Sequence, residues 1–150
     1  MTDTVTDHAR NGDPYDLERF VQAQAPVYSH VLAELRRGRK ASHWMWFVFP
    51  QIAGLGGSPT AVRYAITSID EARAYLDHPI LGKRLRECCE VLLAHDGRTA
   101  EQIFGHPDVL KLRSSLTLFL RAADDPSLYE AMLAKYFDGE PDRRTLALIE

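Results

Sequence analysis

Apolar positions follow a helical period along most of the chain. The clearest stretch comes after Pro79, where apolar residues recur three and four positions apart until Gly97. Because an α-helix turns once in about 3.6 residues, this spacing puts the side chains on one face. The stretch predicts an amphipathic helix with this buried face: Leu81, Leu85, Cys88, Cys89, Leu92 and Leu93.

Capping residues and prolines predict where the other helices begin. Asp16 is placed to cap a first helix, and Ser58 to cap another with Pro59 in its first turn. Two segments, Ser68–Glu71 and Thr99–Gln102, have the form of capping boxes. A proline suits a first helical turn, where its missing N–H would have no partner. Helices are therefore also predicted to begin at four further prolines: Pro26, Pro107, Pro126 and Pro141.

The segment 42–50 is apolar on every side, so its periodicity does not separate a buried strand from a buried helix. A lone strand would leave unpaired backbone groups in the core, and no hairpin turn joins alternating apolar runs. We therefore expect a short buried helix from Ser42 that stops near Pro50. The predicted fold is all-α: a single compact bundle of about eight short helices over residues 15–150, after a flexible tail over residues 1–14.

Composition agrees with one globular domain and argues against several function classes. The 150 residues are 45% hydrophobic and 26% charged, which is ordinary for a folded domain. The net charge of −3 argues against DNA binding. The N-terminal stretch has no apolar run, and the longest apolar run, Trp44–Phe49, is far too short to span a bilayer. We therefore expect a cytoplasmic protein without membrane contact.

The residues that usually hold metals or form covalent intermediates are not arranged for either role. Cys88 and Cys89 are adjacent on an apolar helix face, which predicts a buried, inert pair of thiols. The six histidines are scattered, so no metal site is predicted. The chain has no Gly-x-Ser-x-Gly, His-Glu-x-x-His or Cys-x-x-Cys motif, and no motif that indicates a cofactor.

Candidate functional side chains gather in residues 39–51. Two tryptophans within three positions supply a rigid aromatic surface that is either core or the floor of a pocket. The histidine beside them is either a structural hydrogen-bonding group or an acid–base catalyst. Basic residues before the aromatic run and a glutamine after it suit a polar ligand. This set comprises Arg39, Lys40, His43, Trp44, Trp46 and Gln51.

Two further segments carry polar groups. The glycine-rich loop 54–58 precedes a helix N-terminus but lacks both the dinucleotide-binding and the P-loop pattern, so it is either a tight turn or an unconventional anion nest. Hydroxyls gathered in residues 111–117 go against helix propensity. Helical spacing puts Lys111, Ser114 and Ser115 on one face. The hydroxyls there either bond back to helix carbonyls or form a polar wall that faces a ligand.

Several of these motifs together resemble a bacterial family catalogued as domain of unknown function 1810, over about residues 16–137. The resemblance implies a multihelical fold and no established activity. Some relatives carry an automatic label of calpastatin, a protease inhibitor. Inhibitors of that type are long, largely disordered chains, whereas this chain has core-forming periodicity. The matching motifs are Leu17-x-x-Phe20-Val21-x-Ala23-Gln24, Gly38-Arg39-Lys40-x-Ser42-His43-Trp44-Met45-Trp46-Phe47-x-Phe49-Pro50-Gln51, Gly54-Leu55-Gly56, Tyr64-Ala65-Ile66, His78-Pro79-x-Leu81-Gly82 and Lys111-Leu112-x-Ser114-Ser115-x-Thr117-Leu118-Phe119.

Two functions from different classes fit these residues. The favoured one is a small-molecule site where the 39–58 segment meets the 111–117 helix, for a flat anionic ligand such as a nucleotide or an ADP-ribose-like compound. The alternative is a non-catalytic module that docks another protein through the same surface; RNA contact through Arg36–Lys40 is a weaker third. Enzymatic activity, ligand identity and oligomeric state stay open. In the favoured hypothesis Arg39 and Lys111 hold negative charge, Trp44 stacks, Gln51 and Ser115 orient the ligand, and His43 is the one acid–base candidate.

Overall fold

The computed structural model of the chain describes residues 12–149 and confirms the all-α class. These residues form ten helices and no strand, against about eight helices expected. Of the predicted tail over residues 1–14, residues 1–11 lie outside the described part. The helices are α2 (Glu18–Gln24), α3 (Tyr28–Arg37), α4 (Met45–Val48), α5 (Pro59–Arg63), α6 (Ile69–Asp77), α7 (Leu81–Ala94), α8 (Ala100–Phe104), α9 (Asp108–Ala122), α10 (Ser127–Phe137) and α11 (Arg143–Ile149).

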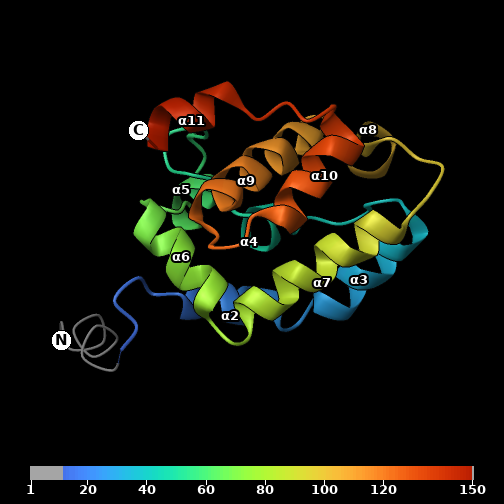
Figure 1. Cartoon of the computed structure of the whole chain (residues 1–150). Coiled ribbons are helices and arrows are strands. Elements are labelled where there is room, and N and C mark those ends of the chain that lie inside the picture. The colour runs from blue at the N-terminus through green and yellow to red at the C-terminus, as the bar shows by residue number, and fades with distance from the viewer. Residues whose placement is uncertain (1–11, 150) are drawn as a thin grey trace.

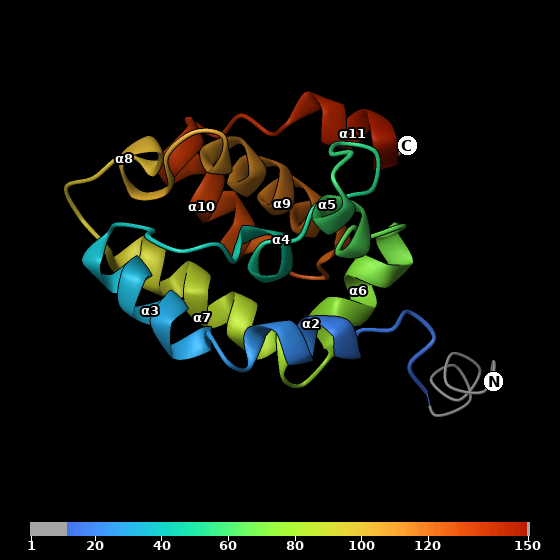
Figure 2. The ribbon, with the colours of Figure 1, turned by 180° about the vertical axis from the view of Figure 1, so that it is seen from behind.

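Helix α9 is the centre of the bundle. It packs against α6, α8, α10 and α11, whereas α7 packs against α3, α6 and α10. In Figures 1 and 2, α3 and α7 lie side by side along one side of the molecule, with α9 between them and α11. None of the helices in residues 12–149 is long and apolar enough to cross a membrane.

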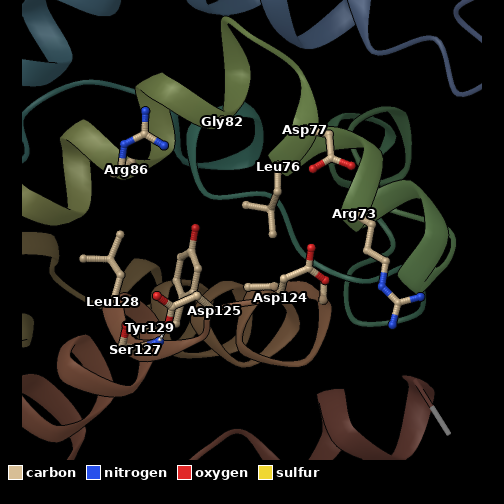
Figure 3. Close-up of a pocket in the computed structure, with 12 residues that line it drawn as sticks. Arg73, Leu76, Asp77, Gly82, Arg86, Asp124, Asp125, Ser127, Leu128 and Tyr129 are labelled. Carbon is tan, nitrogen blue, oxygen red and sulfur yellow. Dashed lines mark hydrogen bonds between the residues drawn. The ribbon is translucent and has the colours of Figure 1, made fainter.

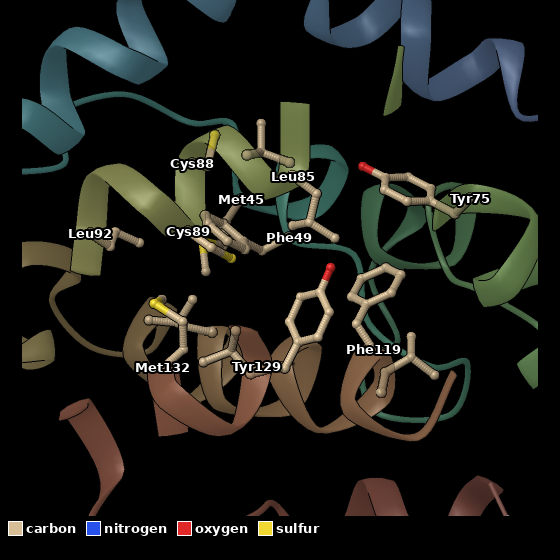
Figure 4. Packing of buried hydrophobic residues seen from close by; sticks show 14 of the residues in the cluster. Met45, Phe49, Tyr75, Leu85, Cys88, Cys89, Leu92, Phe119, Tyr129 and Met132 are labelled. Atoms are coloured by element: carbon tan, nitrogen blue, oxygen red, sulfur yellow. The ribbon is translucent and has the colours of Figure 1, made fainter. Parts of the chain in front are cut away.

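One continuous cluster of buried apolar side chains runs from Leu17, just before α2, to Leu133 in α10. Figure 4 shows its middle, where the apolar face of α7 meets Met132 and Tyr129 of α10 across Phe49. Burial of each large apolar side chain stabilises the fold by about 1.5–3 kcal/mol. The predicted α7 face, with both cysteines, lies in this cluster.

The capping predictions are confirmed at two helices and half-confirmed at a third. Thr99 and Gln102 form a reciprocal capping box on α8, and Ser58 accepts a hydrogen bond from the N–H of Ala61. Ser68 caps α6 by accepting from the N–H of Glu71 at 3.1 Å. The Glu71 carboxylate does not complete that box, because it instead binds the Arg19 guanidinium at 2.9 Å and the Thr67 hydroxyl at 2.8 Å.

The cap of the first described helix is a correction. Asp13, not Asp16, accepts hydrogen bonds from the N–H groups of Leu17 and Glu18, at 2.7 and 3.2 Å. Asp16 has a backbone φ of 50°, a left-handed turn conformation that aspartate tolerates better than most residues. The turn at Asp16 brings Asp13 back over the helix start, so the capping side chain comes from three residues earlier than predicted.

A buried carboxylate organises the connection from α3 to α4. Helix α3 ends at Gly38, whose φ of 73° is readily adopted by glycine. Glu34 then accepts four hydrogen bonds from the chain that follows: from the N–H groups of Ala41 and Ser42, the Ser42 hydroxyl and the Trp44 indole N–H, at 2.6–3.2 Å. Burial alone raises the pKa of Glu34, but these four donors outweigh it and lower the pKa to about 2.

The apolar segment 42–50 is helical, as expected, but its helix is shorter than predicted. Helix α4 covers only Met45–Val48, with Met45 and Val48 buried. Ser42 and Trp44 hydrogen-bond to Glu34, so residues 42–44 do not form a helical turn. This arrangement directs Trp44 into the core and leaves Trp46 half-buried at its edge.

Candidate functional site

An isolated β-bridge positions the loop that follows α4. The N–H of Ile66 donates to the Gln51 carbonyl and the N–H of Ala53 donates to the Ile66 carbonyl, both at 2.8 Å. The bridge joins the two ends of the segment that contains the glycine loop and α5. Leu148 of α11 packs against the same loop at Gly54, where an added Cβ would lie 3.3 Å from its side chain. The loop is therefore held between the bridge and the C-terminal helix.

This loop and helix α9 form the walls of a pocket of about 450 Å³, which we call the α9 pocket. Four of the predicted site residues line it: Trp46, Gln51, Lys111 and Ser114. The two stretches that the sequence marked as candidates, far apart in the chain, thus meet across a hollow. Its remaining lining consists of Leu55, Gly56, Gly57, Ser58, Ala61, Pro107, Leu110, Asp142 and Arg144.

Two lysines share one carboxylate beside the tryptophans. Asp108 lies 2.8 Å from Lys40 Nζ and 3.4 Å from Lys111 Nζ. Each ammonium also lies over an indole ring, Lys40 at 4.9 Å from the centroid of Trp44 and Lys111 at 4.7 Å from that of Trp46. A single carboxylate cannot neutralise two lysines, so this cluster keeps one net positive charge. Lys40 is almost fully buried, with 6% of its side chain exposed, whereas Lys111 is 22% exposed and faces the pocket.

Hydroxyl groups from two helices join at the inner wall. The Thr145 hydroxyl donates to the Asp142 carboxylate, so the Ser114 hydroxyl donates in turn to Thr145, at 2.9 Å between the oxygens. The Asp142 carboxylate also accepts from the Thr145 N–H at 3.0 Å, which caps α11. Asp142 is thus engaged within the fold, while the guanidinium of Arg144 is exposed and has no ion pair within residues 12–149.

Two of the predicted ligand contacts are buried in the core. Trp44 is 1% exposed and packs against Phe49 and Phe104, so neither face of its ring is open to a ligand. This corrects the expectation that Trp44 stacks, and leaves Trp46 as the aromatic wall. Ser115 is fully buried and does not line the pocket, which corrects the expectation that it orients a ligand. Lys111 and Ser114, three positions apart, share the face of α9 that lines the pocket, whereas Ser115 is turned a further 100° away from it.

The basic end of α3 and its neighbouring histidine lie elsewhere. Arg39 and His43 are both exposed, and neither lines the α9 pocket. Lys40 does not line it either, because its ammonium is occupied by Asp108 and the carbonyl of Ser42. The Glu34 hydrogen bonds direct residues 41–44 along the core and set these three side chains apart from the pocket.

The structure adds residues that sequence reasoning missed. Arg144 of α11 and Asp142, just before that helix, reach the pocket, and Leu110 forms part of its rim while remaining 52% exposed. No motif marks Asp142 or Arg144, since they join the site only through the packing of α11 on α9. Leu110 lies four residues before Ser114, and this helical spacing is a local signal that could have placed it on the same surface.

Residues 12–149 contain neither a cluster of metal ligands nor an accessible thiol. No group of three or more His, Cys, Asp or Glu side chains within residues 12–149 is placed to hold a metal ion. Cys88 and Cys89 are fully buried free thiols. Burial raises the pKa of Cys88 to about 12 despite a hydrogen bond with Tyr28, and burial raises that of Cys89 as well, so both stay protonated at neutral pH.

Comparison with known protein families assigns this chain to one of them. Residues 14–149, nearly the whole chain, match the family described as "Protein of unknown function (DUF1810)". The chain belongs to this family. A crystal structure from the organism Mycobacterium tuberculosis, titled as that of the conserved hypothetical protein Rv1873, is 60% identical in sequence and superposes with a TM-score of 0.90. The match covers 91% of this chain and 98% of that protein. No curated protein matches the chain.

Proposed function

We propose that the α9 pocket binds a small anionic molecule with a flat ring, such as a nucleotide. The observation that carries the proposal is the meeting of Trp46, Gln51, Lys111 and Ser114 around one cavity of about 450 Å³. Ligand pockets typically enclose about 300–1,000 Å³ and combine apolar walls with a few polar groups. The α9 pocket has this size and this mixture.

The charges around the pocket favour an anionic group. Three cations, Lys40, Lys111 and Arg144, lie at or beside the pocket against two carboxylates, Asp108 and Asp142, so one net positive charge remains. Arg144 adds a second cation to the lining. A phosphate close to Lys111 and Arg144 would therefore meet two positive groups, and a guanidinium can bind it through two parallel hydrogen bonds.

The aromatic and amide side chains favour a planar ring. Trp46 is half-buried and lines the pocket, and the ammonium group of Lys111 lies over its indole ring. A heteroaromatic ring can stack against such a surface, and the Gln51 amide offers both donors and an acceptor to a base edge. The glycines of the loop leave room for close approach of the ligand.

The proposal concerns binding rather than catalysis. The pocket lining contains no histidine or cysteine, and His43 lies outside it. A docking function has one observation in its favour, the exposed apolar side chains of Leu110 and Leu148, at 52% and 46%. The concave shape of the site favours a ligand over a flat protein interface.

A thermal-shift and calorimetric comparison tests the proposal. AMP, which carries both the ring and the phosphate, is expected to bind and to raise the Tm of the full chain. Adenosine and ribose 5-phosphate each lack one of these groups and should bind at least about tenfold more weakly, a difference of about 1.4 kcal/mol. Saturation at about 100 times Kd would stabilise the fold by about 2.7 kcal/mol.

Variants connect the binding to the pocket. Lys111→Met and Trp46→Leu should each weaken AMP binding about tenfold or more, whereas Lys83→Met, on the exposed face of α7, should leave it unchanged. The Lys111 substitution leaves Asp108 paired with Lys40, so folding should be preserved. Absence of AMP binding, or equal binding by all three variants, would exclude the α9 pocket as a nucleotide site and leave the docking hypothesis.

A further inference from the structure

A second cavity lies between α6 and α7 on one side and the α9–α10 connection with the start of α10 on the other. It encloses about 380 Å³ and shares no lining residue with the α9 pocket. We call it the α7–α10 pocket. Figure 3 shows Leu76 from the end of α6 and Asp124 from the α9–α10 connection directed into this space. Its charged and polar walls come from Arg73, Asp77, Arg86, Asp124, Asp125 and Tyr129.

The hydroxyl of Tyr129 is a hydrogen-bonding group that the described part of the fold leaves free in this pocket. Tyr129 is only 5% exposed, with its ring 6.1 Å from that of Phe119, and its hydroxyl has no hydrogen-bond partner within residues 12–149. In Figure 3 the hydroxyl points from α10 toward α7. Burial raises the pKa of Tyr129, so the group stays protonated and available as a donor. The hydroxyl oxygen is not one of the fully buried unpaired atoms, so it opens onto the pocket, where a ligand oxygen can accept its hydrogen bond.

The pocket also presents unpaired charges of both signs. Among the described residues, Arg86 has no ion pair, and neither Asp77 nor Asp124 has a cationic partner. Asp125 is different, because its carboxylate accepts hydrogen bonds from the N–H and the hydroxyl of Ser127. The unpaired guanidinium and the unpaired carboxylates can therefore accept a ligand that carries one group of each sign.

Apolar side chains complete the lining. Leu76 of α6 and Leu128 of α10 both contribute to the wall. Gly82, at the start of α7, keeps the backbone close, since a Cβ there would lie 2.1 Å from the carbonyl oxygen of Leu76. The space thus combines an apolar wall with charged groups at its opening.

We infer that the α7–α10 pocket binds an α-amino acid with an apolar side chain. The guanidinium of Arg86 and the hydroxyl of Tyr129 bind its carboxylate, Asp124 and Asp77 bind its ammonium group, and its side chain packs against Leu76 and Leu128. A guanidinium and a carboxylate match in a two-point hydrogen-bonded pair, and the volume suits a ligand of this size.

Calorimetry on the full chain with L-leucine as the probe tests this inference. Isocaproate has the same side chain and carboxylate but no ammonium group, and isoamylamine has the side chain and ammonium group but no carboxylate. L-leucine is expected to bind saturably, with each analogue at least about tenfold weaker, because each loses one charged contact. Binding of isoamylamine as tight as that of L-leucine would overturn the proposal in favour of a simple cation site. Absence of binding by L-leucine, L-valine and L-phenylalanine would overturn it altogether.

Two substitutions assign the binding to this pocket. Tyr129→Phe removes only the hydroxyl, and Arg86→Met removes the cation from an exposed position, so both variants should fold. Each should weaken L-leucine binding about tenfold, while Lys83→Met on the same helix should not. AMP binding is measured in parallel and should be unchanged in both variants, because the α9 pocket shares none of these residues. Unaltered leucine binding in Tyr129→Phe and Arg86→Met would refute the assignment.

Discussion

Replacement of Glu34 by glutamine isolates the charge that organises the α3–α4 connection. Three of the four donors reach one carboxylate oxygen, Oε1, and the Ser42 hydroxyl reaches the other. A glutamine can keep its amide oxygen toward the three donors and offer its NH₂ group to the hydroxyl, which can also accept. Glu34→Gln therefore preserves the shape of the connection and removes its negative charge.

The pKa of Glu34 gives the size of the effect. Its fall from the ordinary value of 4.5 to about 2 corresponds to about 3 kcal/mol of folding free energy. Because the folded-state pKa is lowered, this contribution is fully present above pH 4.5 and is lost as the pH falls from 4.5 toward 2. For a chain of this length, about 3 kcal/mol corresponds to a fall in Tm of about 6–12 °C in the variant at neutral pH.

Urea unfolding of both proteins across this pH range measures the effect. The gap in unfolding free energy between wild type and Glu34→Gln should be about 3 kcal/mol at neutral pH and should narrow below pH 4.5. Glu90→Gln, at an exposed position in the middle of α7, is the matched control and should differ from wild type by less than about 0.5 kcal/mol. Equal stability of wild type and Glu34→Gln, or a gap that does not change with pH, would refute the role assigned to the carboxylate.

Two further predictions concern the α7 region. Gly82→Ala should destabilise the fold by about 1–3 kcal/mol despite the better helix propensity of alanine, because its Cβ would lie 2.1 Å from the backbone oxygen of Leu76. Gly57→Ala is the control, since a Cβ there meets no atom within 4 Å. Thermal melts in which both variants match wild type would contradict this reasoning. Cys88 and Cys89 should resist alkylation by iodoacetamide in the native protein at mildly alkaline pH and react after denaturation, since their thiols are buried and protonated. Alkylation of either residue under native conditions, detected by mass spectrometry, would contradict this prediction by showing that the thiol is accessible.

Local sequence signals predicted the helices well because their causes are local. The Thr99–Gln102 capping box and the apolar face of α7 depend on residues within a few positions of one another, and both are present. The cap at Asp16 failed because a turn at that residue brings Asp13 to the helix start instead. The second half of the Ser68 box failed because Glu71 finds Arg19, which is distant in the chain.

The candidate site was predicted in its outline but not in its membership. Helical spacing placed Lys111 and Ser114 on the face that lines the pocket. It did not show which of Trp44 and Trp46 would be buried, because that depends on the hydrogen bond from Trp44 to Glu34. Arg144 was missed because it reaches the pocket only when α11 packs on α9. Long-range packing, which no local pattern encodes, decides these positions.

Tryptophan fluorescence tests the nucleotide site most directly, because the two indoles differ in environment. Trp46 lines the α9 pocket and Trp44 is 1% exposed in the core. Titration with AMP should quench the emission of the wild-type protein saturably through stacking on Trp46, and Trp46→Phe, which retains only the Trp44 signal, should show no such change. Saturable quenching that persists in Trp46→Phe, or AMP binding that leaves the wild-type emission unchanged, would contradict a ligand ring against Trp46 in the α9 pocket.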